Sequence, residues 1–151
     1  MSHYHGNDLR KGRFSEPGRI YLLTTITKDR NKLFTNLDNN RIIINELLHS
    51  QTLGLCENIA WVVMPDHLHW LVSLQKGTLA NLMKRMKSRS AIHLNRVRHS
   101  KVSVWQRGYH DHALRKEEDV KSVARYIVAN PLRAGLVENI GDYPYWDTAW
   151  L

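Results

Sequence analysis

Two histidines separated by one leucine, His67 and His69, are the side chains whose spacing first suggests chemistry in this sequence. They follow a Pro65-Asp66 step with apolar runs on both sides, so the pattern predicts a strand, a tight turn and a second strand. Because side chains alternate along a strand, both imidazoles would point to one face of the sheet. The pair would supply two ligands of a metal site. Two buried histidines satisfied by hydrogen bonds are the alternative.

The sequence holds nine histidines, and the pairs His3/His5 and His110/His112 repeat the same spacing. Those two pairs fall in stretches typical of loops, whereas the His67 pair falls in a predicted central strand beside a turn. The predicted position, rather than the spacing alone, therefore makes the His67 pair the candidate site.

Tyr126 and Asn130 are the second pair of candidates, because residues four apart project from one face of a helix. Tyr126 offers a phenolic oxygen that can act as a nucleophile, and Asn130 offers a carbonyl oxygen that can act as a hard ligand. Two imidazoles and an amide oxygen with open positions suit Mg²⁺ or Mn²⁺ better than a closed zinc site. Such an ion stabilises charge on a phosphate. The alternative is a packed tyrosine and a helix-ending asparagine before Pro131.

Four strands and three helices are expected to position these side chains. Runs of β-branched, aromatic and aliphatic residues predict strands over residues 19–27, 55–64, 67–74 and 102–105. Apolar stripes predict helices over residues 38–50, 78–99 and 116–129, with a further turn over 132–137 and Asp38 as the first cap. This order predicts an α+β, ferredoxin-like fold, in which a four-stranded antiparallel sheet carries helices on one face.

The chain has 151 residues and 42% hydrophobic content, which favours a single domain over residues 1–151. Residues 1–17 are expected to form a basic N-terminal arm and residues 138–151 an aromatic C-terminal tail. No apolar run approaches the roughly 20 residues of a membrane span, and the N-terminus carries no apolar signal segment. With Cys56 as the only cysteine, we expect a cytoplasmic, nucleoid-associated protein without a membrane partner.

The net charge of +8 and the pI near 9.8 favour a polyanionic partner, with nucleic acid as the first choice. Basic residues concentrate in the long second helix and in the N-terminal arm. The predicted phosphate contacts are Lys84, Arg85, Lys87 and Arg89 in the helix and Arg10, Lys11 and Arg13 in the arm. The alternatives are a solvated basic surface and a frayed terminus.

Three motifs, in the same order along the chain, resemble those of the IS200-type single-tyrosine HUH transposases, and closely those of the REP-associated tyrosine transposases. They are residues 64–69 (MPDHLH), residues 105–109 (WQRGY) with 111–115 (DHALR), and residues 126–137 (YIVANPLRAGLV). The resemblance implies the HUH endonuclease fold, with His67 and His69 as metal ligands and Tyr126 as the nucleophile. Asn130 would complete the metal site, at a place where insertion-sequence relatives often carry glutamine.

Members of that family cut single-stranded DNA near hairpins, form a 5′-phosphotyrosine link, release a 3′-OH and can rejoin strands. The resemblance therefore implies Mg²⁺ or Mn²⁺ as the cofactor and single-stranded or hairpin, REP-like DNA as the partner. His112 is a candidate for proton transfer, phosphate contact or hydrogen-bonded support of the site. Asp111 and Arg115 are further candidates for support, and Arg115 would pair with phosphate or with an acidic neighbour.

Two other functions stay open from the sequence. One is a catalytically inactive, domesticated DNA-binding regulator, and the other is a metal-dependent phosphodiesterase that uses water. Insertion-sequence relatives tend to be dimers that exchange the tyrosine helix, but we expect a monomer here, with a homodimer as the alternative. The aromatic tail is expected to pack on the surface or in a groove, and we hypothesise that it covers the active site.

Overall fold

The computed structural model describes residues 18–115 and 118–149. The predicted N-terminal arm, with Arg10, Lys11 and Arg13, lies outside the described residues. So do residues 116–117, at the predicted start of the third helix, and residues 150–151. None of the helices in the described ranges has the length and apolar character needed to cross a bilayer.

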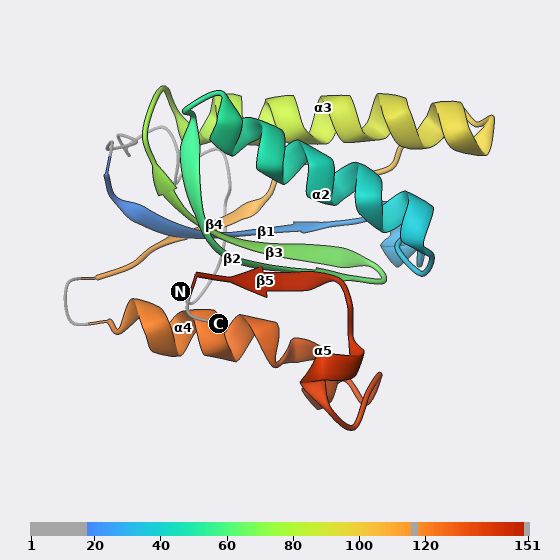
Figure 1. Cartoon of the computed structure of the whole chain (residues 1–151). Coiled ribbons are helices and arrows are strands. Elements are labelled where there is room, and N and C mark those ends of the chain that lie inside the picture. Colours follow the sequence, from blue (N-terminus) through green and yellow to red (C-terminus); the bar gives the residue numbers. More distant parts are fainter. Residues whose placement is uncertain (1–17, 116–117, 150–151) are drawn as a thin grey trace.

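Within these ranges, five antiparallel strands form one sheet in the order β4-β1-β3-β2-β5 (Figure 1). The strands are β1 (Ile20–Ile26), β2 (Cys56–Met64), β3 (His67–Leu74), β4 (His110–Ala113) and β5 (Trp146–Thr148). Strands β1 to β4 and the helices between them have the order and pairing of a ferredoxin-like fold, which confirms the predicted class. The described sheet has five strands, however, and the prediction of four was wrong.

The fourth strand lies later in the chain than predicted. Residues 102–105 are apolar and β-branched, but only Trp105 makes a bridge, to Thr27, outside the regular strands. Trp105 is buried, and its indole Nε1 donates to Ser90 Oγ at 3.0 Å, so this segment packs as a loop against the core. Instead, β4 pairs with β1, and the His110/His112 pair lies in a strand rather than in a loop.

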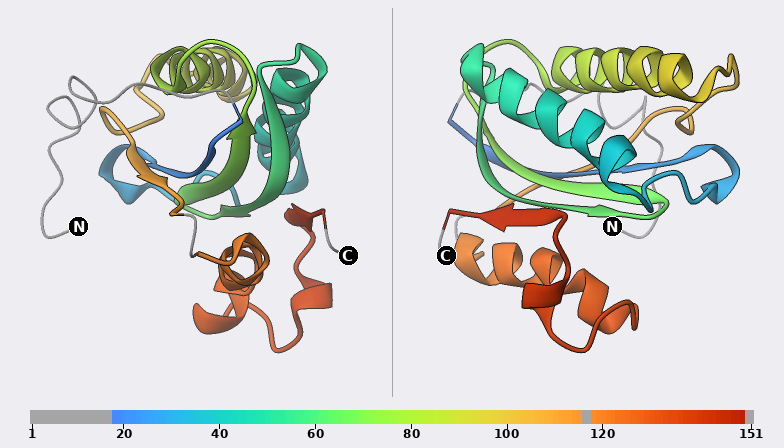
Figure 2. Two further views of the ribbon diagram at one scale, coloured as in Figure 1. Left: turned by 90° about the vertical axis from the view of Figure 1, so that its left-hand side faces the viewer. Right: turned by 45° about the vertical axis from the view of Figure 1, so that its right-hand side comes forward.

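Helices α2 (Leu37–Thr52) and α3 (Leu79–Arg98) cover one face of the sheet (Figure 2). Thr78, where this helix was predicted to begin, caps α3, since its side chain accepts from the backbone N–H of Asn81. The cap of α2 is Asn36 rather than Asp38, and Asp38 lies in the first turn, where the helix dipole favours a carboxylate. Alternate side chains of β3, from Leu68 to Leu74, are buried in this layer.

Helices α4 (Val120–Val128) and α5 (Asn130–Arg133) lie on the opposite face, so the prediction of helices on one face was wrong (Figures 1 and 2). Their core contains Ala124, Ile127 and Val128 of α4 with Val62, Met64 and Leu71 of the sheet. Because Leu71 belongs to this core, the alternation of β3 places His67 and His69 on the same face. The hairpin therefore presents its histidines to the α4–α5 layer.

The aromatic tail adds to the edge of the sheet rather than packing loosely on its surface. The short 3-10 helix η2 (Ile140–Asp142) leads into β5, which pairs with β2. Tyr143 is buried, and its hydroxyl donates to the backbone oxygen of Val63 at 2.6 Å. Burial, helped by the neighbouring Tyr145, raises the pKa of Tyr143 to about 12, so the phenol keeps the proton that it donates. The tail is a structural element of the fold.

Candidate active site

The two histidines of β3 are held so that each ring has one nitrogen engaged by a protein partner. The ring centroids of His67 and His69 are 4.9 Å apart, with the ring planes at 78°. The Nδ1 atom of His67 lies 2.7 Å from the Asp66 carboxylate, and the Nδ1 atom of His69 lies 2.8 Å from the Thr24 hydroxyl. Thr24 is in position because the antiparallel register of β1 and β3 sets it directly opposite His69. The other ring nitrogen of His69, Nε2, makes no hydrogen bond within the described residues, whereas Nε2 of His67 is approached by Asn130.

Asp66 fixes the orientation of His67. A carboxylate only accepts hydrogen bonds, so Nδ1 of His67 carries a proton and Nε2 is the ring nitrogen that points away from Asp66. Partial burial by itself raises the pKa of the Asp66 carboxyl. The hydrogen bond and charge of His67, and then those of Arg30 at 3.2 Å, outweigh that effect and hold the pKa below its ordinary value. Asp66 is therefore ionised at neutral pH and does more than shape the turn.

His69 is held in its neutral form. Burial, and then the positive charges of His67 and Arg133, lower the pKa of His69 from 6.5 to about 4. Metal ions bind the neutral imidazole, because a protonated ring has no lone pair to offer. At pH 7 His69 would therefore bind a metal ion without first having to lose a proton.

Asn130 meets the pair from the other side of the site, because its Nδ2 atom lies 3.3 Å from Nε2 of His67. Asn130 is the first residue of α5, and Pro131 fits the first helical turn, where no backbone N–H is required. In residues 18–115 and 118–149, no group of three or more His, Cys, Asp or Glu side chains could hold a metal ion. With the amide turned over, Oδ1 of Asn130 and Nε2 of His67 would face each other as two lone pairs, an arrangement that a cation between them would stabilise.

Tyr126 lies on the outer side of α4. Its side chain is 64% exposed, whereas Ile127 and Val128 anchor the helix to the sheet. In the described part of the chain its hydroxyl makes no hydrogen bond, and its contact is with Arg133, whose guanidinium carbon lies 3.8 Å from the ring centroid. Arg133 also acts electrostatically on His69. The Arg133 guanidinium therefore lies against the Tyr126 ring and is near enough to His69 for its charge to lower the pKa of that imidazole.

The predicted supporting residues lie farther away. Nε2 of His112 lies 3.1 Å from Oε1 of Glu118, and the same carboxylate accepts from the backbone N–H of Arg115 at 2.8 Å. These bonds tie β4 to the segment before α4. Asp111 is buried and pairs in register with Leu23, so it points to the α2–α3 face, away from the histidines. The structure does not bring these three residues to the His67 pair.

The basic residues predicted in the long helix lie on α3, across the sheet from the histidine pair. Lys84 is exposed, but the other three have protein partners. Arg85 contacts His49 Nδ1 at 3.3 Å, Lys87 donates to the backbone oxygens of Gln106 and Gly108 at 2.7 and 2.5 Å, and Arg89 donates to Glu46 at 2.8 Å. The contact of these four residues with DNA stays a prediction. Lys84 is the best placed of them, because its side chain is exposed and the other three have protein partners.

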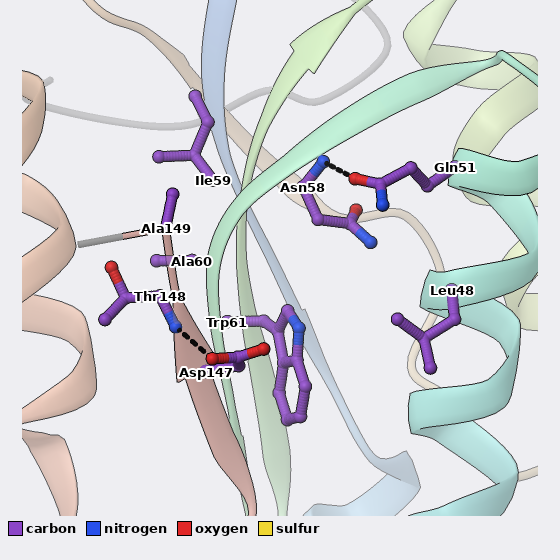
Figure 3. Close-up of a pocket in the computed structure, with 9 residues that line it drawn as sticks. All are labelled: Leu48, Gln51, Asn58, Ile59, Ala60, Trp61, Asp147, Thr148 and Ala149. Atoms are coloured by element: carbon purple, nitrogen blue, oxygen red, sulfur yellow. Dashed lines mark hydrogen bonds between the residues drawn. The ribbon is translucent and has the colours of Figure 1, made fainter. Parts of the chain in front are cut away.

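A separate hollow of about 120 Å³ opens between α2 and the β2–β5 edge (Figure 3). Its polar lining is already engaged in part, since Gln51 Oε1 accepts from the backbone N–H of Asn58 at 2.7 Å and Asp147 accepts from the backbone N–H of Thr148. None of the predicted site residues lines this hollow. It is therefore distinct from the site around His67.

Three contributors to the site escaped prediction. Thr24 had no local signal, because only the pairing register of β1 with β3 brings it to His69. The orienting role of Asp66 could have been found from its place directly before His67. Arg133 follows Asn130 by three residues in a helical motif, a spacing that places both side chains on one side of the helix.

An antiparallel sheet presents the histidine pair on its central strand to the layer that contains the tyrosine-bearing helix, which is the arrangement expected from the resemblance to the HUH transposases. The solved structure described as a REP-associated tyrosine transposase bound to a REP hairpin superposes with a TM-score of 0.73 at 23% identity, covering 97% of this chain and 82% of the other. A protein of Deinococcus radiodurans, provisionally described as a transposase, superposes with a TM-score of 0.56 at 20% identity, covering 79% and 95%. These likenesses establish the fold.

The chain belongs to the IS200-like transposase family, because the family model described as "Transposase IS200 like" matches residues 18–130. A Haemophilus influenzae protein that bears the provisional name REP-associated tyrosine transposase is 28% identical over 144 residues, covering 85% of this chain and 78% of the relative. The Escherichia coli REP-associated tyrosine transposase is 28% identical over 88 residues, covering 57% of this chain and 50% of the relative. The family predicted from the motifs is confirmed, and its members are transposases, enzymes that cut and transfer DNA strands.

Proposed function

We propose that this protein cuts and rejoins single-stranded DNA beside a REP-like hairpin, with Tyr126 as the nucleophile. The observation that carries the proposal is the 3.3 Å approach of Asn130 to Nε2 of His67, on a ring whose other nitrogen is fixed by Asp66. This contact joins the helix segment that bears Tyr126 to the histidine strand. The two motifs, 63 residues apart, thus form one site.

His67, His69 and Asn130 would hold the divalent ion. Mg²⁺ or Mn²⁺ bound there supplies charge that polarises the scissile phosphate. Neutral His69 and the oriented His67 offer their Nε2 lone pairs, and the amide of Asn130 offers its oxygen. Asp66 and Thr24 keep the two rings in place, so the protein needs little reorganisation to bind the ion.

Tyr126 would carry the covalent chemistry. Its oxygen attacks the phosphorus, the bond from phosphorus to the 3′ oxygen breaks, and the departing oxygen takes up a proton as the phenol loses one. The products are a 5′-phosphotyrosine and a free 3′-OH. Attack by a 3′-OH on that link reverses the step and rejoins a strand, and the phosphotyrosine conserves the energy of the original bond. Exposure of Tyr126 leaves room for a DNA strand beside its hydroxyl.

The net charge of +8 supports a DNA substrate. A hairpin is the substrate class we infer, because a solved structure of the same fold is described as bound to a REP hairpin. Lys84 on α3 would contact the backbone far from the cut. We expect the protein to act as a monomer in the cytoplasm, at the nucleoid.

The test is incubation of the protein with hairpin-bearing single-stranded DNA and Mg²⁺ or Mn²⁺, followed by denaturing electrophoresis. We expect a DNA–protein adduct from the wild type and from Tyr145→Phe, a matched loss of one hydroxyl, and none from Tyr126→Phe. Cleavage that survives Tyr126→Phe would show a phosphodiesterase that uses water. DNA binding without adduct or cleavage would instead support a domesticated regulator.

A further inference from the structure

We propose that Arg133 binds the phosphodiester that Tyr126 attacks, as a phosphate-binding residue between the nucleophile and the histidine pair. The proposal rests on the proposed function and adds a residue to its site. The guanidinium carbon of Arg133 lies 3.8 Å from the centroid of the Tyr126 ring. A phosphate that is in reach of the tyrosine oxygen is thus also near this cation.

The short helix α5 sets this position. Asn130 and Arg133 are its first and last residues, three apart, so both side chains leave the same side of the helix. Asn130 reaches Nε2 of His67 at 3.3 Å, and the charge of Arg133 is felt by His69. One turn of helix therefore places an amide beside His67 and a cation against Tyr126 whose charge reaches His69.

The N–H groups of the Arg133 guanidinium are available to donate hydrogen bonds to a ligand. Among the residues that the structure describes, its guanidinium makes no hydrogen bond or ion pair, and the contact over the Tyr126 ring uses its charge and none of its N–H groups. Other arginines near the sheet are engaged, Arg30 with Asp66 and Arg89 with Glu46. A guanidinium has five N–H donors in a planar fork that matches two oxygens of a phosphate.

The electrostatics of the site also favour an anion. Arg133 is a permanent cation whose charge reaches His69, and the Asp66 carboxylate lies on the Nδ1 side of His67, away from Nε2. A phosphodiester bound on the Nε2 side of the histidines would accept hydrogen bonds from the N–H groups of Arg133 while its phosphorus lies near Tyr126. Fixed donors that face the oxygens of a reacting phosphate stabilise the charge that develops on them.

The direct test observes Arg133 itself and does not depend on catalysis. The Nε–H signals of ¹⁵N-labelled arginines are recorded by NMR in the full-length Tyr126→Phe protein, with metal removed by EDTA. The probes are thymidylyl-thymidine, which has one charged phosphodiester, and its methylphosphonate analogue, which has an uncharged linkage. The Arg133 signal is assigned by its loss in Arg133→Lys.

We expect the Arg133 signal to shift saturably with the phosphodiester and to stay in place with the methylphosphonate. Arg125 is the matched internal control, because it is an exposed arginine directly before Tyr126 on α4. Its signal should move with neither probe. An Arg133 signal that ignores the phosphodiester, or that shifts equally with both probes, would overturn the proposal.

Adduct formation under single-turnover conditions gives the second readout. Removing one such donor from a charged transition state typically costs about 10²–10³ in rate, so we expect a loss of that size in Arg133→Ala. Arg133→Lys keeps the charge but not the fork and should lose less. Normal adduct formation by Arg133→Ala, with no shift of Arg133, would leave strand transfer standing and remove Arg133 from it. A shift of Arg133 without an adduct from any DNA would keep the phosphate site and remove strand transfer.

Discussion

The two halves of the site are built to different degrees of rigidity. His67 and His69 lie in a strand paired on both sides, and each ring is fixed by a hydrogen bond to Asp66 or Thr24. Tyr126 lies on the outer side of a helix, 64% exposed, with its ring against Arg133. The difference indicates that the sheet pre-organises the half proposed to bind the metal ion, whereas the proposed nucleophile is left accessible to a DNA strand.

Removing a ligand from the rigid half should give the largest effect. We expect His69→Ala to slow adduct formation by roughly 10²–10³-fold, because the ion that polarises the phosphate loses a ligand that is neutral at pH 7. The measurement is the single-turnover adduct rate at saturating Mn²⁺. His93→Ala, at an exposed histidine of α3, is the matched control and should react as the wild type does. Equal rates for both variants would contradict a metal role for His69.

The stability of the half that bears Tyr126 should depend on the buried side of its helix rather than on Tyr126 itself. Ile127 is 2% exposed, and an Ile→Ala change at such a site typically costs about 2–5 kcal/mol of unfolding free energy. Tyr126→Ala removes an exposed ring and a cation–π contact, for which we expect about 1 kcal/mol or less. Urea unfolding measures both. A larger loss for Tyr126→Ala would mean that the tyrosine holds the helix in place.

The pH dependence of stability should report the partly buried ring of His69. Its pKa is about 4 in the folded protein and near 6.5 when unfolded, so between these values the unfolded chain binds the extra proton. Its contribution is present above pH 6.5 and is lost as the pH falls toward 4, on the order of 3 kcal/mol at most. Urea unfolding in EDTA should show a shallower loss for His69→Gln than for the wild type. Parallel pH profiles would show that the ring is more solvated than the structure indicates.

Orientation of His67 should matter less than the presence of its ring. Asp66→Asn lets the side chain at position 66 offer an N–H to Nδ1, which disturbs the tautomer, and such changes typically lower metal affinity about 10–100-fold. Arg30→Ala removes an exposed partner of Asp66 and should change affinity less than about fivefold. Calorimetric titration with Mn²⁺ in the absence of DNA separates the two. Wild-type affinity in Asp66→Asn would leave the carboxylate with a structural role only.

The sequence predicted the fold best where a local pattern coincided with the final packing. The limits of β3 agree with the prediction, because a turn precedes the strand, a break follows it, and every second side chain between them is apolar. The strand at 102–105 failed because Val104 and Trp105 are buried in a loop that packs against the core, while the polar segment His110–Ala113 takes the edge position beside β1. An amphipathic helix shows which side it buries but not which face of a sheet covers it, so the place of α4 could not be predicted.

The site shows the same division between local and distant information. The alternation of β3 was enough to put His67 and His69 on one face, but nothing in their spacing pointed to Asn130, and the motifs of the family supplied that pairing. Thr24 and Arg133 reach the site through tertiary structure, one by strand register and the other by contact with Tyr126. In the tail, aromatic residues suggested a cover, yet the structure uses Tyr143 and β5 to complete the sheet.

The most direct test of strand transfer through Tyr126 is to identify the residue that becomes linked to DNA. The adduct formed with hairpin DNA and Mn²⁺ would be trapped by denaturation, digested with protease and nuclease, and sequenced by mass spectrometry. The proposed chemistry predicts a nucleotide joined through its 5′ phosphate to the peptide that contains Tyr126. A nucleotide on another residue, or cut DNA with a free 5′ phosphate and no linked peptide, would contradict it.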